Sequence, residues 1–229
     1  MSSKPKKEIL FTPVGTVEPY AYLAKPDFGR DGFASERGKY KLSLTVPGKL
    51  AQPLVKKIVD LHEADYAARV AEFEEKKPEL LKKLPRGKKL QEPYVGDLPF
   101  FENDDGTVTF KFVSWASYEK EGELIPLVLK VVDAKGKAIQ KVPNISGGSE
   151  GKARFSIIPY GWNATVGCSV KLQLEGFMLT KLVEFGGGED DWGGQEEDGY
   201  VADESQGSSR EEDQWAEDGD GQEPDDGDF

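Results

Sequence analysis

The chain has 229 residues, and its 42 acidic and 30 basic side chains give a formal net charge of −12. A single cysteine, Cys168, and a single histidine, His62, exclude a disulfide framework, a structural zinc site and a Cys–His catalytic pair. The N-terminus lacks the long apolar core of a secretory signal, and no apolar run reaches the roughly 18 residues of a membrane-spanning helix. We therefore expect a soluble intracellular protein with no cofactor and no metal.

The acidic residues are concentrated near the C-terminus. Residues 186–229 contain 18 Asp or Glu and one Arg, a net charge of −17, which leaves +5 on residues 1–185. The acidic segment has few large apolar residues, so burial cannot offset the entropy that folding would cost. We expect one folded domain over residues 1–185, long enough to bury a single core, and a disordered tail over residues 186–229.

The first third of the chain combines short strands with a loop. Residues 8–23 mix apolar residues with Pro and Gly, which is typical of bent or edge strands. The Gly, Pro and Asp content of residues 25–38 indicates a loop, although this segment also carries aromatic and basic residues. Residues 39–46 alternate strictly between polar and apolar side chains, which predicts a half-buried strand.

One helix is predicted after this strand. Apolar or half-polar residues recur at intervals of three or four, which draws one stripe along a helix: Val55, Val59, His62, Tyr66, Val70 and Phe73. We expect the helix to end at Pro78 and the basic stretch over residues 76–89 to be mobile or surface-lying. A lone histidine on the apolar stripe is more typical of packed core than of a ligand site, so His62 is assigned no function.

The remainder of the folded part has β character. Turns are indicated at residues 104–106 and 133–136, and alternation over residues 108–112 and 170–175 predicts strands. The total of five to seven short strands and one helix favours a mainly β fold, a small closed antiparallel barrel with one inserted helix.

Aromatic and basic residues occur together at three places in the chain. Single-stranded nucleic acid is bound by such pairs, because every base has a face that stacks and every nucleotide carries a charge. The three groups are Phe28 and Phe33 with Arg30 and Arg37; Phe110, Phe112 and Trp115 with Lys111; and Phe155, Tyr160 and Trp162 with Lys152 and Arg154. We expect Arg154, Tyr160 and Trp162 to face one shared channel.

Packing in the core is the competing explanation for these rings. Strict alternation places Phe110 and Phe112 on one face of a strand, and this favours the core for both. Tyr160 and Trp162 lie beside Pro159 and Gly161, so both core packing and base recognition stay open for them. The five bases between Leu81 and Leu90, which include Arg86, are interpreted as a site for a phosphate backbone or as an ordinary solvated loop.

The acidic tail carries rings among its charges, namely Trp192, Tyr200 and Trp215, and it ends on Asp228 and Phe229. Negative charge with aromatic rings is what single-stranded DNA also offers, so a groove that accepts DNA should accept this tail. A flexible coil of 44 residues spans roughly 35–40 Å, which is enough to reach the folded domain.

Several long blocks carry a resemblance to a known family: GTVEPYAYLAKPD, VGDLPFFENDDGTVTFKF, PYGWN, VGCSVKLQLEGFML, FGGGEDDW and the terminal GDF. The chain resembles the single-stranded DNA-binding proteins of T7-like bacteriophages nearly from end to end. The resemblance implies a homodimeric OB-fold barrel that coats single strands during phage replication, recombination and repair in the host cytoplasm. It also implies a tail that competes with DNA and contacts the phage DNA polymerase and helicase-primase.

The resemblance assigns roles to individual residues. It implies that Arg37, Arg86, Arg154 and Tyr160 contact DNA and that Phe229 anchors the tail, with Trp215 and Asp228 beside it. Trp115 stands where the family can show Tyr, so stacking should survive. Val113 stands where the family can show Lys, so one phosphate contact is expected to be missing. The predicted DNA site comprises Arg37, Arg86, Lys111, Trp115, Arg154, Tyr160 and Trp162.

Two other functions are weighed against DNA binding. A protein-interaction module or chaperone with an acidic tail would not need the aromatic and basic residues of the folded part. A nuclease would need carboxylates clustered around a metal, and none is convincingly placed. The sequence therefore favours a DNA-binding protein that is not an enzyme.

Overall fold

The fold is taken from a computed structural model, which describes residues 8–30 and 34–183. The strands are β1 (Leu10–Phe11), β2 (Gly15–Val17), β3 (Tyr22–Asp27), β4 (Lys39–Pro47), β5 (Phe100–Glu102), β6 (Thr107–Trp115), β7 (Ser117–Lys120), β8 (Glu123–Pro126), β9 (Lys130–Val132), β10 (Glu150–Tyr160) and β11 (Ser169–Lys181). The helix α1 (Gly48–Lys83) connects β4 to the segment before β5. The described residues thus hold more strands than predicted, because several are only two to four residues long.

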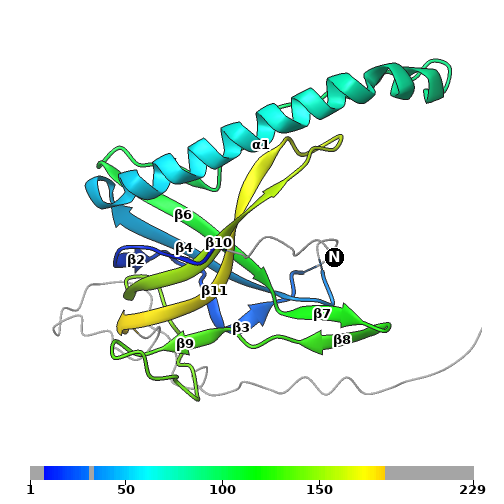
Figure 1. Cartoon of the computed structure of the whole chain (residues 1–229). Coiled ribbons are helices and arrows are strands. Elements are labelled where there is room, and N and C mark those ends of the chain that lie inside the picture. The colour runs from blue at the N-terminus through cyan, green and yellow to red at the C-terminus, as the bar shows by residue number, and fades with distance from the viewer. Residues whose placement is uncertain (1–7, 31–33, 184–229) are drawn as a thin grey trace, which may run out of the picture. The chain divides into compact units, whose positions relative to one another are not determined.

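Five strands close into a barrel, in the order β10, β2, β4, β6, β11 and back to β10 (Figure 1). The pairing of β6 with β11 is parallel, with Leu172 opposite Phe112, whereas the other pairings in this ring are antiparallel. Closure leaves the ring without a free edge for another strand to pair with. The predicted closed barrel with one inserted helix is confirmed, with one parallel pair in an otherwise antiparallel ring.

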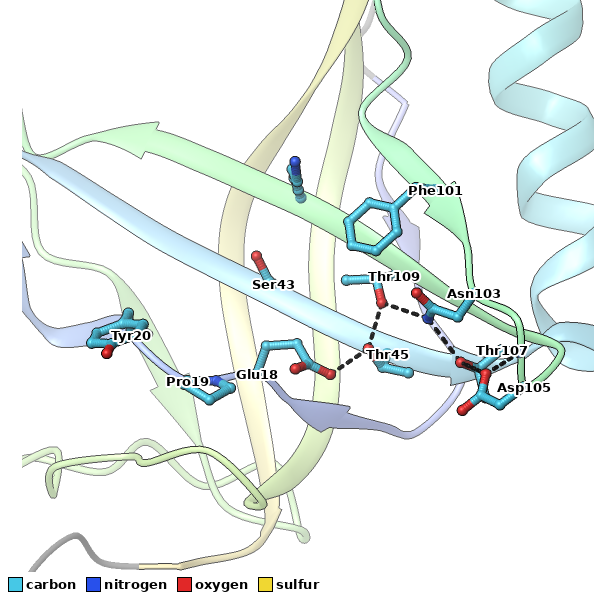
Figure 2. Close-up of a pocket in the computed structure, with 11 residues that line it drawn as sticks. Glu18, Pro19, Tyr20, Ser43, Thr45, Phe101, Asn103, Asp105, Thr107 and Thr109 are labelled. Carbon is cyan, nitrogen blue, oxygen red and sulfur yellow. Dashed lines mark hydrogen bonds between the residues drawn. The ribbon is translucent and has the colours of Figure 1, made fainter.

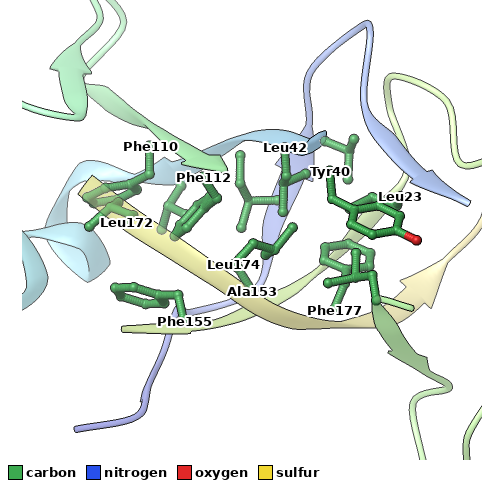
Figure 3. Close-up of a cluster of buried hydrophobic side chains, with 14 of the residues drawn as sticks. Leu23, Tyr40, Leu42, Phe110, Phe112, Ala153, Phe155, Leu172, Leu174 and Phe177 are labelled. Carbon is green, nitrogen blue, oxygen red and sulfur yellow. The ribbon is translucent and has the colours of Figure 1, made fainter. Parts of the chain in front are cut away.

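The core fills the inside of this barrel. Along β4 the side chains of Tyr40, Leu42, Leu44 and Val46 are buried, as the strict alternation predicted. Rings and aliphatic side chains from the other strands meet them: Val108, Phe110, Phe112, Phe155, Leu172, Leu174 and Phe177 (Figure 3). Phe112 packs edge-on against Phe155 with a ring separation of 5.1 Å. The assignment of Phe110 and Phe112 to the core is confirmed.

The helix α1 packs on the barrel mainly with its first half. Ala51, Val55, Ile58 and His62 are buried, whereas most side chains beyond Phe73 are exposed. Because this end of the helix projects from the barrel (Figure 1), its orientation depends on polar contacts more than on apolar burial.

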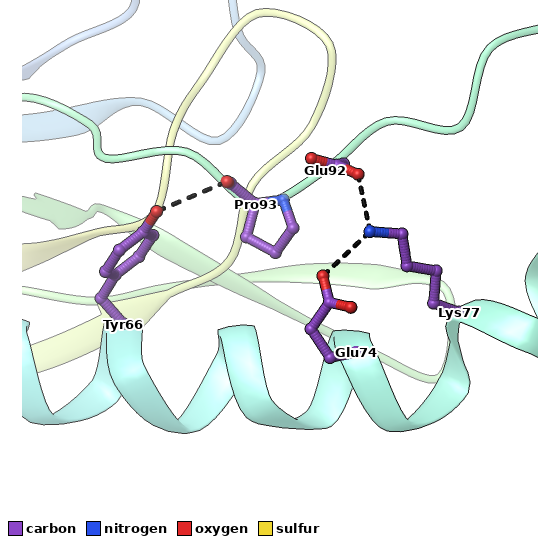
Figure 4. Close-up of polar contacts among 5 residues, drawn as sticks. All are labelled: Tyr66, Glu74, Lys77, Glu92 and Pro93. Carbon is purple, nitrogen blue, oxygen red and sulfur yellow. Dashed lines mark hydrogen bonds and ion pairs between the residues drawn. The ribbon is translucent and has the colours of Figure 1, made fainter.

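The prediction that the helix ends at Pro78 is wrong, because α1 continues to Lys83 with Pro78 inside it. Proline removes one N–H donor, but here the carbonyl left unpaired lies on an exposed stretch, where water can bond to it. Ion pairs hold this stretch: Lys77 Nζ lies 3.0 Å from Glu74 and 2.9 Å from Glu92 (Figure 4). Glu92 belongs to the segment that returns toward β5, so Lys77 ties the end of the helix to that segment.

His62 and Cys168 join the helix to the β10–β11 hairpin. His62 Nε2 lies 3.1 Å from the carbonyl oxygen of Cys168, and both residues are buried. Burial also raises the pKa of the Cys168 thiol. Both residues thus serve the packing, as the sequence indicated for His62.

Gly151 allows β10 to cross closely over β11. A Cβ atom at this position would meet the Met178 carbonyl oxygen and the Phe177 ring well inside van der Waals distance. We expect Gly151→Ala to lower the free energy of unfolding by about 1–3 kcal/mol, because the crowded strands would have to move apart. Chemical denaturation measures this change. An unchanged unfolding midpoint would show that β11 yields without strain.

Candidate nucleic-acid interface

The outward side chains of β4 and β6 form one continuous face. In the register of this pair, Lys39 lies opposite Trp115 and Ser43 opposite Lys111. Alternation sends every second side chain away from the core, so the outward residues of both strands lie side by side. We call this surface the β4–β6 face; its side chains are Lys39, Lys41, Ser43, Thr45, Thr109, Lys111, Val113 and Trp115.

A cationic cluster surrounds Trp115 at one end of the β4–β6 face. The guanidinium carbon of Arg37 lies 4.4 Å from the centre of the Trp115 ring, and Lys39 Nζ lies 4.6 Å from it. Arg37 donates to the Ser117 carbonyl oxygen at 3.0 Å, and the Ser117 hydroxyl donates to the Arg37 carbonyl oxygen at 3.0 Å. The ring stabilises two neighbouring cations that would otherwise repel each other. The Trp115 ring therefore holds these two cations close together, and with them over it, it is less open for stacking on a base.

Lys111 and Phe101 form a second pair of cation and ring. Lys111 Nζ lies 5.1 Å from the centre of the Phe101 ring, and the Phe101 side chain is 45% exposed. Phe101 reaches this position because β5 pairs with β6, with Phe101 opposite Thr109. An exposed ring beside a cation can stack on a base while the cation holds the adjacent phosphate.

The centre of the face carries less free charge. Lys41 lies opposite Val113, and its ammonium group pairs with Asp27 and lies 5.8 Å from the Tyr22 ring. The hydrogen bond from Lys41, followed by one from the Gly29 N–H, lowers the pKa of Asp27. Asp27 therefore stays ionised and neutralises Lys41, so Arg37, Lys39 and Lys111 contribute most of the positive charge on this face.

A polar pocket of about 570 Å³ continues the face beyond Lys111 (Figure 2). Its lining comes from the segment after β2, from β4, from β5, from the turn before β6 and from β6 itself: Glu18, Pro19, Tyr20, Ser43, Thr45, Phe101, Asn103, Asp105, Thr107, Thr109 and Lys111. Hydroxyl groups link the two acidic ends of this lining in a hydrogen-bond network. The pocket shares Ser43, Thr45, Thr109 and Lys111 with the β4–β6 face, so a strand bound along β4 and β6 would reach it.

The structure brings together only some of the predicted site residues. Arg37, Lys111 and Trp115 lie on or beside the β4–β6 face. Arg86 lies in the exposed turn just beyond the end of α1. This end of α1 projects from the barrel (Figure 1). Arg154 lines a separate pocket of about 290 Å³ together with Phe11, Lys130, Lys152 and other residues.

Tyr160 and Trp162 lie at the end of β10, beside α1. Trp162 packs edge-on against Phe73 at a ring separation of 5.9 Å and lines a pocket of about 330 Å³ with residues of the helix. Tyr160 is half-buried opposite Ser169. Arg154 and Trp162 line different pockets, so the expected single channel for these three residues is not found. Their contact with DNA stays a prediction.

Lys39, Lys41, Tyr20 and Phe101 lie on or beside this surface but were not among the predicted site residues. The alternation around Lys39 and Lys41 was visible, but polar positions on a half-buried strand usually face only water. The register that sets them beside residues of β6 is a long-range property. For Phe101, the sequence did offer a signal, namely two adjacent phenylalanines after Pro99. Of the two, Phe101 is exposed, and its ring faces Lys111.

Within the described ranges, no group of three or more His, Cys, Asp or Glu side chains could hold a metal ion. None of the helices in the same part of the chain is long and apolar enough to cross a membrane. The tail residues Trp215, Asp228 and Phe229, and Phe33 of the first aromatic group, lie outside the described residues.

Comparison with known proteins supports the resemblance of the sequence blocks. The family described as the single-stranded DNA-binding protein of bacteriophage T7 matches residues 14–182. The single-stranded DNA-binding protein of Escherichia phage T7 is 52% identical over 203 residues, 86% of either chain. Its counterpart in Enterobacteria phage T3 is 51% identical over 201 residues, 85% of either chain.

A solved structure agrees with the fold. The crystal structure of gp2.5, a single-stranded DNA-binding protein encoded by bacteriophage T7, superposes with a TM-score of 0.69 at 48% identity and covers 86% of this chain and 100% of that one. The family is named for binding DNA and not for a reaction, in agreement with the expectation of a protein that is not an enzyme. The chain therefore belongs to the family of the bacteriophage T7 single-stranded DNA-binding protein.

Proposed function

We propose that this protein binds single-stranded DNA along the β4–β6 face during phage DNA replication, recombination and repair. One observation carries the proposal: the β4–β6 register gathers Arg37, Lys39 and Lys111 with the rings of Trp115 and Phe101 on one outward surface. The T7 and T3 relatives are named as single-stranded DNA-binding proteins, which supports the same assignment.

The chemistry of the face suits a strand of any sequence. Cations bind phosphates through a salt-sensitive electrostatic term, and exposed rings stack on bases without selecting among them. Arg37 is held by its bonds with Ser117, and its Nε is buried without a hydrogen-bond partner among the described side chains and backbone. A phosphate oxygen would therefore be bound by the terminal nitrogens of this half-buried guanidinium group and not by Nε.

The second part of the proposal concerns the acidic tail. Residues 186–229 carry a net charge of −17 with three internal rings and a terminal Phe229, which matches the charge and stacking chemistry of DNA. We propose that this tail competes with DNA for the cationic face of the domain formed by residues 1–185 and recruits the phage DNA polymerase and helicase-primase. Tethering can give a local concentration in the millimolar range, so weak binding suffices for competition.

We place this activity in the cytoplasm of the infected bacterial host and propose that the protein acts as a homodimer. Both statements rest on the family resemblance. Sedimentation of the full-length chain measures the oligomeric state.

Phe101→Ala is expected to weaken binding to an oligo-dT strand by about 1–3 kcal/mol, because a base loses its stacking partner. The dependence of affinity on salt should stay the same, since no charge is removed. Fluorescence-anisotropy titration measures both quantities. Phe11→Ala is the matched control, because Phe11 is also an exposed ring (64%) but lines the Arg154 pocket. A loss of affinity in Phe11→Ala alone would move the interface to that pocket.

Val113→Lys is expected to strengthen binding and to steepen the slope of log K against log salt by about 0.7, the value for one more phosphate contact on a single strand. The reason is that position 113 lies opposite Lys41, whose charge Asp27 neutralises. The same titration in a salt series measures the slope, with Val113→Met as the uncharged control. An unchanged slope in Val113→Lys would show that no phosphate passes this position.

Removal of residues 203–229 is expected to tighten binding to oligo-dT at low salt, and the gain should shrink as salt screens the tail. An equal affinity of both proteins throughout the salt series would exclude competition by the tail. The truncated protein should also fail to retain the phage polymerase and helicase-primase in a pull-down assay. Retention of both enzymes would place the recruiting surface elsewhere.

A further inference from the structure

The pocket lined by Glu18 and Asp105 is acidic, whereas the rest of the β4–β6 face, which it adjoins, carries cations. It lies between the segment after β2 and the β5–β6 turn, and Figure 2 shows its network running from Glu18 across Thr45 and Thr109 to Asn103. Its only cation within the described lining is Lys111, at the border with the β4–β6 face. A bound strand that follows the cations would therefore place a different part of the nucleotide here.

The hydrogen bonds of this network are donated outward from Asn103 along two branches, each of which ends on a carboxylate. The Thr45 hydroxyl donates to Glu18 Oε1 at 2.5 Å, since a carboxylate can only accept. Thr45 has no second hydrogen, so at the 2.6 Å contact between the two hydroxyls Thr109 must donate to Thr45. The Asn103 amide nitrogen then donates to Thr109 at 3.0 Å.

In the second branch the hydrogen bonds are likewise donated away from Asn103, here toward Asp105. The Asn103 amide nitrogen also donates to the Thr107 hydroxyl at 2.8 Å, and Thr107 donates to Asp105 Oδ1 at 2.6 Å. The hydroxyl and backbone N–H groups of Thr107 lower the pKa of Asp105, which therefore stays ionised. Every hydroxyl hydrogen of these three threonines is thus committed inside the network. What the network leaves for a ligand is acceptor capacity, on the carboxylates and on the hydroxyl lone pairs.

An acceptor-rich, anionic pocket repels phosphate and attracts a hydrogen-bond donor. A nucleobase with an exocyclic amino group provides such a donor, and cytosine, adenine and guanine carry one, whereas thymine and uracil have carbonyl oxygens as their exocyclic polar groups and only the ring N3–H as a donor. Rings line the same pocket, because Phe101 is 45% exposed and Tyr20 is 88% exposed. Lys111 stands where the adjoining phosphate would lie.

The backbone at Tyr20 gives independent support for a ligand here. Tyr20 has a φ of +66°, in the left-handed region that bulky residues rarely occupy. Strained residues of this kind cluster at ligand sites, where the strain holds a side chain in a required position. At Tyr20 the strained backbone accompanies a ring left almost fully in solvent beside the pocket.

We propose that this pocket is a base subsite that prefers bases with an exocyclic amino group, with Glu18 as the residue that determines the preference. The proposal rests on the proposed binding of single-stranded DNA along the β4–β6 face. It adds selectivity at one position to a surface that otherwise binds without regard to sequence.

Two oligonucleotides that differ mainly at one functional group test this preference. Twelve-residue strands of deoxycytidine and deoxyuridine carry an amino group and a carbonyl oxygen, respectively, at the same ring position. Anisotropy titration of the full-length protein at pH 8, in EDTA and at fixed salt, gives the ratio of the two affinities. We expect the deoxycytidine strand to bind about three- to tenfold more tightly, as one charge-assisted contact at a partly exposed site allows.

Glu18→Gln is the decisive variant. The amide oxygen that this substitution introduces can still accept from Thr45, so the network is kept, while the amide NH₂ group turns an acceptor site into a donor. Affinity for both strands should rise, because a negative charge is lost, and the preference for deoxycytidine should fall to about one or reverse. Glu102→Gln is the matched control, since Glu102 is an exposed residue of β5 outside the pocket lining. It removes the same charge and should leave the ratio as in the unaltered protein.

The outcomes separate this inference from the function on which it depends. If Glu18→Gln changes both affinities by the same factor, as Glu102→Gln does, Glu18 acts only through its charge and the subsite is overturned. If the unaltered protein binds neither strand, the proposed function itself has failed. A ratio that shifts in Glu18→Gln alone supports the base subsite.

Discussion

The alternation of side chains along β4 and β6 is the constraint on which the rest of the structure depends. Their apolar residues must point into the barrel, because closure buries that side completely. The register between the two strands is then fixed, and with it the neighbours of every outward residue. A slip of β6 by one residue would bury Lys111 and expose Phe110 and Phe112. The cationic face therefore exists because the core is packed as it is.

Charge is organised locally rather than by the sum over the domain. A net charge of +5 on residues 1–185 is small, yet Arg37 and Lys39 are concentrated around one ring, and Asp27 removes the effect of Lys41. Beyond Lys111 the sign reverses, at the network between Glu18 and Asp105. A strand bound as proposed would meet cations along its phosphates and acceptors at one base. Lys39, Lys111, Thr45 and Thr109 stand on β4 and β6, whereas Arg37, Glu18 and Asp105 stand on the segments that flank the strands.

Local sequence patterns predicted the strands and the helix, whereas the composition of the proposed site depends on the pairing of strands that are distant in sequence. The strand over residues 39–46, the helix and the burial of Phe110 followed from periodicity, because periodicity reflects which side chains must be buried. The helix was predicted to end too early, at Pro78. Pro78 is accommodated inside α1 because its turn is exposed, so that water can bond to the free carbonyl and ion pairs hold the turn. Arg154 and Trp162 are only eight residues apart, but the strand from Arg154 to Tyr160 alone spans about 20 Å, since each strand residue adds about 3.3 Å. No local pattern shows that Arg37 and Trp115 meet.

Chemical labelling of lysines with and without a bound strand tests the location of the interface most directly. Acetylation of the full-length protein, read by mass spectrometry, reports each ammonium group separately. Binding of an oligo-dT strand should protect Lys39 and Lys111 on the β4–β6 face and leave Lys130 and Lys152 of the Arg154 pocket as reactive as before. Protection of Lys130 and Lys152 with unchanged reactivity at Lys39 and Lys111 would contradict the account.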